Sequence, residues 1–143
     1  MKKEIVKTDW IEGMHFVSDI DNYKIKLDAE ADFGGKAKGN RPKPLMLAAL
    51  GGCTAMDVVS LLNKMRMPFE SLQVEVAAEL TDEHPKVYQN VKVTYLIKGG
   101  NVDHEKVEKS VQLSQDKYCG VIAMFKAFTN VTYEIVYLSE ALV

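Results

Sequence analysis

The sequence has few residues of the kinds that build metal centres and disulfide frameworks. Its 143 residues include two cysteines and three histidines. Cys53 and Cys119 lie far apart in the sequence and outside any Cys-x-x-Cys pair, and the histidines are scattered. Zinc sites and thioredoxin-type motifs need closely spaced ligands or thiols, so the spacing indicates neither. We therefore expect no metal ion and no bound cofactor.

Positive charge is not in excess either. The chain carries 18 lysines and arginines against 20 acidic residues, and the lysines are spread along its length. Proteins that bind nucleic acid concentrate basic residues on one face, so we expect no nucleic-acid partner. Residues 1–16 contain basic residues without a continuous apolar segment behind them, which does not match a secretory signal. We expect a cytoplasmic protein, in which a permanent disulfide is disfavoured.

The longest apolar run, residues 45–62, barely reaches the length that spans a bilayer, and Gly51, Gly52 and Asp57 interrupt it. We interpret it as a buried helix and expect no membrane partner. No repeat, linker or low-complexity segment divides the chain, and its hydrophobic content of 47% is enough for one core. We therefore expect a single domain over residues 1–143.

The order of the predicted elements indicates an α+β fold. Helical periodicity predicts a long helix from Pro44 to Arg66, and a second helix from about Asp103 that Gly120 breaks just after Cys119. Turn residues between neighbouring strands predict antiparallel pairing. The predicted strands cover residues 3–10, 14–20, 23–29, 70–82, 87–99 and 131–138. The residues expected on one side of the second helix are Val107, Val111, Tyr118 and Ile122.

The long helix is apolar or small on nearly all sides between Leu45 and Leu62. A helix on the surface of one small domain normally has a polar stripe, so we expect a second subunit to cover part of it. Two glycines directly before Cys53 each cost about 1 kcal/mol of helix propensity relative to alanine. They would offset that cost by allowing a close approach, either inside the subunit or from a partner.

Two cysteine contexts point to a known family. The segments 47-LAALGGCTAMDVVSLL-62 and 117-KYCGV-121, with the order of elements over essentially the whole chain, resemble the OsmC/Ohr family of osmotically inducible and organic hydroperoxide resistance proteins. The resemblance implies an OsmC-like fold with antiparallel sheets and a long central helix. It also implies an intertwined homodimer with two equivalent sites between the subunits.

The resemblance further implies a thiol-dependent reduction of organic hydroperoxides, with Cys53 as the peroxidatic cysteine and Cys119 as the resolving cysteine. The peroxidatic thiolate attacks one peroxide oxygen and becomes a sulfenic acid. The resolving thiol then forms a disulfide with it, which an external dithiol reduces. The implied partners are a small apolar hydroperoxide and this dithiol. The candidate pocket or core residues are Leu45, Met46, Leu50, Met56, Met65 and Met67.

The segment just before the long helix departs from the family pattern. Typical members favour the thiolate with an arginine that a glutamate holds, in a Pro-x-Glu or Pro-Glu context just before the central helix. Here the segment 41-RPKPL-45 places Lys43 and Pro44 at the glutamate positions. Arg41 is the arginine nearest to Cys53 in sequence and is our candidate for the activating cation. The further cationic candidates are Lys36, Lys38 and Lys43.

Asp57 lies four residues after Cys53 and therefore on the same helix face. A carboxylate at this position would disfavour a thiolate. Alternatively, Asp57 hydrogen-bonds a neighbouring loop. With the missing glutamate, this keeps a second function open: a dimeric OsmC-like protein that binds a small apolar ligand and has weak or no peroxidase activity.

Overall fold

The computed structural model describes residues 1–139, which group into two compact units, Met1–Met46 and the chain from Leu47 onward. The first unit contains an antiparallel meander of β1 (Lys7–Glu12), β2 (His15–Ile20) and β3 (Tyr23–Leu27). These strands confirm the three predicted near the N-terminus, although β1 begins later and β3 ends earlier than expected. A short 3-10 helix, η1 (Ala31–Phe33), follows them.

The loop after β3 is held by one buried carboxylate. Asp28 accepts hydrogen bonds from the backbone N–H groups of Ala29 at 2.7 Å, Lys36 at 3.4 Å and Lys38 at 3.0 Å. The N–H of Lys38 is the largest cause that lowers the pKa of Asp28, because a carboxylate that accepts these bonds is favoured over the protonated acid. The glycine-rich loop is therefore ordered by an acid and not by a core of its own.

The long helix α1 (Pro42–Lys64) begins two residues earlier than predicted. Proline suits the first helical position because its missing N–H would have no partner there. Arg66 adopts a left-handed conformation (φ 54°) just after the helix, and the N–H of Met67 bonds to the carbonyl of Leu62. This left-handed arrangement ends many helices.

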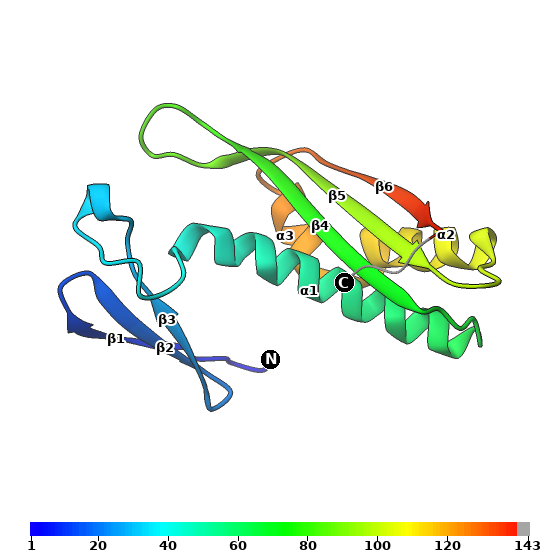
Figure 1. The fold of residues 1–143 in the computed structure, drawn as a ribbon, viewed down its shortest axis with the longest axis horizontal. Helices are drawn as coiled ribbons and strands as arrows, with labels where there is room; N and C mark the ends of the chain where they lie inside the picture. The colour runs from blue at the N-terminus through cyan, green and yellow to red at the C-terminus, as the bar shows by residue number, and fades with distance from the viewer. Residues whose placement is uncertain (140–143) are drawn as a thin grey trace. The chain divides into compact units, whose positions relative to one another are not determined.

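The second unit is built on a three-stranded sheet in the order β4–β5–β6, with β4 at Ser71–Leu80, β5 at Tyr88–Lys98 and β6 at Val131–Leu138 (Figure 1). β4 and β5 form the predicted antiparallel hairpin. β6 pairs with β5 in parallel, which departs at this edge from the antiparallel sheets that the resemblance implies. The reason is the connection from β5 to β6, which contains helices α2 (His104–Leu113) and α3 (Gly120–Lys126), and crossovers of this length join parallel strands.

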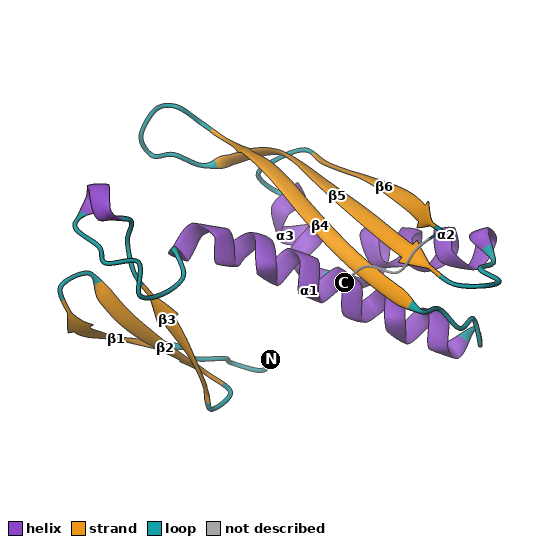
Figure 2. Ribbon diagram, in the orientation of Figure 1, coloured by secondary structure: helices purple, strands orange, loops and turns teal. Residues whose placement is uncertain are grey.

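The core lies between this sheet and the helices (Figure 2). Alternate residues of β5 are fully or almost fully buried, namely Val91, Val93, Tyr95 and Ile97. These residues share one face, since residues two apart on a strand point to the same side of the sheet. The helices contribute Leu50, Val58, Leu62, Val107, Val111, Ile122 and Phe125 to the same core.

The second predicted helix is divided. Its α-helical part ends at Leu113, a π-helical turn η2 (Ser114–Tyr118) follows, and Cys119 is extended (φ −78°, ψ 103°). Gly120 is the first residue of α3, so the break falls at Cys119 and not at the glycine. The wider π turn also changes the phase of the helix. For this reason Tyr118, predicted on the buried side, is 51% exposed.

α1 is buried on one face only within the single chain, through Leu50, Gly51, Thr54, Val58 and Leu62. Met56, on another face, is 75% exposed. Among the described residues, α1 is the one helix that is long and apolar enough to cross a membrane by length and composition alone. One face of α1 packs against the core of the second unit, and the cover that we expect from a second subunit over the remaining faces stays a prediction.

Candidate functional site

The fold brings together three side chains that can act as nucleophiles or ligands. Cys53 and Asp57 lie one turn apart on α1, and Cys119 lies between η2 and α3. The two sulfur atoms and a carboxylate oxygen of Asp57 all lie within 4.8 Å of one another. Both cysteines are free thiols, Cys53 half-buried and Cys119 buried. The wide sequence separation of the two cysteines did not indicate this cluster. The expectation that the protein holds no metal ion stays a prediction.

Cys119 owes its position to the break between the helices. Its extended backbone lets it act as the N-terminal cap of α3, and its Sγ accepts a hydrogen bond from the backbone N–H of Ile122 at 3.4 Å. Burial raises the pKa of Cys119 to about 12, and its hydrogen bond with Cys53 contributes in the same direction. Cys119 therefore holds its proton at neutral pH.

A chain of buried hydrogen bonds runs from the core to Asp57. Ser114 Oγ donates to Asp57 Oδ2 at 2.9 Å, and Thr54 Oγ1 lies 2.7 Å from Ser114 Oγ. Tyr95 Oη lies 2.6 Å from Thr54 Oγ1 and accepts a bond from Gln115 Nε2 at 2.9 Å. Thr54, Tyr95 and Ser114 are fully buried.

The carboxylate fixes the direction of every bond in this chain. The carboxylate of Asp57 only accepts hydrogen bonds, so Ser114 donates its one hydroxyl proton to Asp57. Ser114 must then accept the hydrogen bond that it shares with Thr54. Thr54 in turn must accept from Tyr95, which keeps its proton because burial raises the pKa of its phenol. All the donors therefore point towards Asp57, an arrangement in which successive hydrogen bonds strengthen one another.

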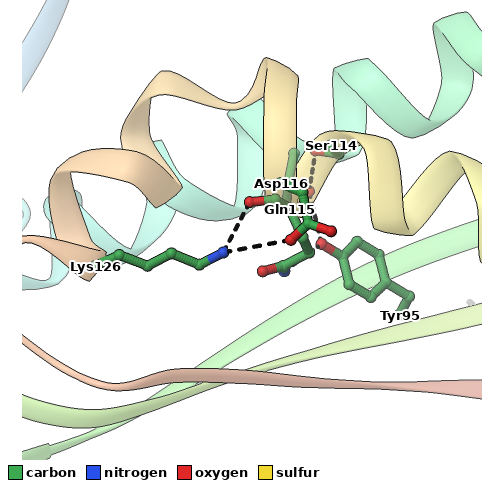
Figure 3. Close-up of polar contacts among 6 residues, drawn as sticks. Tyr95, Ser114, Gln115, Asp116 and Lys126 are labelled. Atoms are coloured by element: carbon green, nitrogen blue, oxygen red, sulfur yellow. Dashed lines mark hydrogen bonds and ion pairs between the residues drawn. The ribbon is translucent and has the colours of Figure 1, made fainter.

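A lysine at the end of α3 also holds the π turn in place. Lys126 Nζ, at the end of α3, donates to the carbonyl of Gln115 at 2.9 Å and pairs with Asp116 at 3.7 Å (Figure 3). Together with the bond from Ser114 to Asp57, these contacts hold the first three residues of the π turn that precedes Cys119. Sequence reasoning missed Thr54, Tyr95, Ser114 and Gln115, and the available signal was a polar threonine directly after Cys53 in an apolar run.

The other predicted residues fall in different surroundings. Arg41 lies in the first unit, where its Nε pairs with Glu30 Oε1 at 3.4 Å, both side chains being more than half exposed. Glu30 thus holds the arginine although no glutamate occupies the positions of Lys43 and Pro44. Lys38 pairs with Glu12 at 3.6 Å. The hydrogen bond from Ser114 bears out the interpretation of Asp57 as a partner of a neighbouring segment.

The two glycines before Cys53 differ. A methyl group added to Gly51 would lie 3.3 Å from Val76 Cγ2, so this glycine allows a close internal approach of α1 to β4. A methyl group on Gly52 would meet nothing within 4 Å. The internal crossing therefore explains the first glycine and leaves the second without a contact in the described chain.

Comparison with known proteins settles the family. Residues 35–134 match the OsmC-like protein family, and YhfA of Escherichia coli K12 is 32% identical over 133 residues, covering 91% of this chain and 96% of YhfA. The chain belongs to the OsmC-like protein family. This confirms the resemblance found in the cysteine contexts.

Solved structures confirm the α+β fold of this OsmC-like protein. A hypothetical protein from Aquifex aeolicus has a TM-score of 0.82 at 28% identity, covering 97% of this chain and 100% of its own. An organic hydroperoxide resistance protein OsmC from Legionella pneumophila has a TM-score of 0.67 at 15% identity, covering 95% and 98%. The second likeness shows the fold alone.

Proposed function

We propose that this OsmC-like protein reduces organic hydroperoxides, with Cys53 as the attacking thiol and Cys119 as the resolving thiol. The observation that carries the proposal is the pair of sulfur atoms within 4.8 Å, of which one is half-buried and the other buried and protonated. The name of the Legionella relative, an organic hydroperoxide resistance protein, supports the substrate class.

In the first step, Cys53 attacks the peroxide. Burial keeps the proton on Cys119, and a protonated thiol is a poor nucleophile, so the attacking thiolate is that of Cys53. A new S–O bond forms, the O–O bond breaks, and the leaving alkoxide takes a proton to give an alcohol. Cys53 is left as a sulfenic acid.

The second step uses the proton that Cys119 has kept. Its sulfur attacks Cys53, the S–O bond breaks, and the hydroxide leaves with the thiol proton as water. An S–S bond of about 2.05 Å requires the two sulfurs to move together from their present separation. The disulfide is then reduced by thiol–disulfide exchange with an external dithiol, which restores both cysteines.

We propose Arg41 as the cation that favours the Cys53 thiolate, since it is the nearer of the two arginines in sequence and is already held by an acid. Arg41→Ala should slow the oxidation of Cys53. Arg66→Ala is the matched control, because Arg66 lies beyond the opposite end of α1 at a similar sequence distance from Cys53, and none of the described ion pairs includes it. Equal rates in both variants would remove Arg41 from the mechanism.

We also propose a homodimer in which a second copy covers the exposed apolar face of α1. A hollow of about 650 Å³ opens along this face and is lined by Ala55, Met56, Val59, Ser60, Asn63, Phe69, Glu70, Ser71 and Leu72. Burying apolar surface of this kind is worth roughly 25 cal/mol per Å². Sedimentation of the purified protein at micromolar concentration tests the proposal, and a monomer at all concentrations would refute it.

The direct test of the peroxidase proposal is mass spectrometry of the reduced, metal-free protein after one equivalent of cumene hydroperoxide. We expect the loss of two hydrogens, mapped to a Cys53–Cys119 link. In Cys119→Ser we expect one added oxygen on Cys53, and in Cys53→Ser no fast reaction. An unchanged mass in the parent protein after minutes would sink the peroxidase proposal.

The same hollow supports the second candidate function, the binding of a small apolar ligand. Met56 and Ser60 lie three and seven residues after Cys53, so the hollow adjoins the helix face that carries the thiol. This candidate predicts saturable binding of a fatty or aromatic ligand that survives Cys53→Ser. No binding across a panel of such ligands would count against it.

A further inference from the structure

Cys53, Asp57 and Cys119 each offer one atom of a kind that binds metal ions, and the spacing of these atoms is close to that around a tetrahedrally coordinated ion. Zinc binds thiolate sulfur at about 2.3 Å and carboxylate oxygen at about 2.0–2.2 Å, which places neighbouring ligand atoms roughly 3.5–3.8 Å apart. The two sulfurs and the Asp57 oxygen already lie within 4.8 Å of one another. Side-chain movements of about 1 Å would therefore close the set around one ion.

The carboxylate has the surroundings of a metal ligand. Asp57 forms no ion pair with any described residue, and its one described hydrogen bond, from Ser114, uses Oδ2 and leaves Oδ1 without a described partner. The buried chain behind Ser114 orients the carboxylate. Hydrogen bonds of this kind, made by groups outside the ligand set, commonly orient metal-binding carboxylates.

The sulfur of Cys119 lies at the N-terminus of α3, where it accepts the backbone N–H of Ile122 at 3.4 Å. Burial keeps the proton on this thiol, so a metal ion must displace that proton in order to bind the sulfur. Two thiolates and a carboxylate would together carry three negative charges, and none of the described ion pairs brings a cation to them. A divalent cation would supply the missing positive charge, and sulfur ligands select zinc over magnesium or calcium.

We propose that Cys53, Asp57 and Cys119 bind one Zn²⁺ ion, with the fourth position open to water or another small ligand. Binding displaces the thiol protons to solvent and forms two Zn–S bonds and one Zn–O bond. The ion occupies the sulfur lone pairs that a peroxide would need, so the metal-bound protein resists oxidation. The proposal goes beyond the peroxidase function and does not depend on it, because it requires only the thiols and the carboxylate.

The test is a competition for Zn²⁺ alone between a chromophoric chelator and the reduced, metal-free full-length protein. We expect one ion per chain with a dissociation constant at or below about 1 µM. Asp57→Asn should weaken binding by about tenfold or more, and Cys119→Ser by more still. Asp116→Asn is the matched control, because this acid lies near the site yet its side chain is 63% exposed and pairs with Lys126.

Each outcome has one meaning. Loss of binding in the Asp57 and Cys119 variants, with affinity kept in Asp116→Asn, supports the site, provided circular dichroism shows that the variants are folded. Equal affinity in all four proteins would place the metal elsewhere and overturn the proposal, as would a dissociation constant above about 100 µM. Because no hydroperoxide is present, failure here leaves the peroxidase result untouched, and a failed peroxidase assay leaves this one untouched.

Discussion

Ser114 donates a hydrogen bond of 2.9 Å to Asp57, and this bond joins the π turn before Cys119 to the helix that carries Cys53. The two cysteines come from segments far apart in the sequence. The bond crosses between those segments directly beside the sulfur atoms. Together with the Thr54–Ser114 bond of 2.7 Å, which joins the same two segments, it holds the geometry of the thiol pair.

Removing this bond should slow the closure of the disulfide. In Ser114→Ala we expect the sulfenic acid on Cys53 to form at the parent rate, and the disulfide to form roughly 10- to 100-fold more slowly, because misplacement by about 1 Å costs rate on this scale. Quenched mass spectrometry in the presence of a chelator separates the two steps. Ser110→Ala is the matched control, since Ser110 is equally buried but bonds only within its own helix, to the carbonyl of Val107. Parent-like closure in Ser114→Ala would contradict the positioning role.

Thr54 should matter for stability. Thr54→Val keeps the shape of the side chain but leaves Tyr95 without an acceptor and Ser114 without a donor, both in the core. We expect a loss of about 1–3 kcal/mol in the free energy of unfolding, the usual cost of a buried unsatisfied polar group. Urea unfolding measures it. Thr132→Val, on the exposed side of β6, should change the same quantity by less than about 0.5 kcal/mol, and similar losses in the two variants would argue against a special role for the chain.

The raised pKa of Cys119 predicts how stability depends on pH. The folded state keeps the thiol proton up to a pKa of about 12, whereas the ordinary value is 9.0. The stability linked to this proton is complete below pH 9 and is lost as pH rises towards 12, because the unfolded chain releases its proton first. The stability of Cys119→Ala should therefore fall less steeply between pH 9 and 12 than that of the parent. Parallel curves over this window would show that the thiol is not held neutral.

The two glycines should respond differently to alanine. Gly52→Ala adds a methyl group that meets nothing in the described chain, so it should gain about 1 kcal/mol of helix propensity. If a partner subunit approaches there, as we propose, the same change should weaken self-association in sedimentation experiments. Gly51→Ala should leave self-association unchanged, because its methyl group would press on Val76 of the same chain. Unchanged self-association in Gly52→Ala would mean that no partner packs on this glycine.

Much of the fold could be predicted because local patterns and packing agree. The alternation in β5 and the length of α1 both follow from periodic apolar residues, and those residues are buried as the periods require. The parallel edge at β6 could not be predicted from its own sequence, since the same strand can pair in either direction. The connection decides the direction of pairing, because a crossover that contains helices joins parallel strands.

The site was predicted unevenly for a similar reason. Cys53, Cys119 and Asp57 carry recognisable chemistry, so they stand out even in an isolated sequence. Thr54, Ser114 and Tyr95 are common residue types whose importance comes from a three-dimensional chain of hydroxyl groups. No spacing along the sequence indicates such a chain, because its members come from a helix, a π turn and a strand.

The position of Cys119 depends on the number of residues in the π turn 114–118 as well as on their identity. An α-helix advances by about 100° per residue, so removing one residue here would rotate everything that follows by nearly a third of a turn. Cys119 would then leave its place opposite Cys53, and a neighbouring side chain would take it. Insertions and deletions in this short segment should therefore be rarer among functional descendants of this chain than substitutions at the same positions.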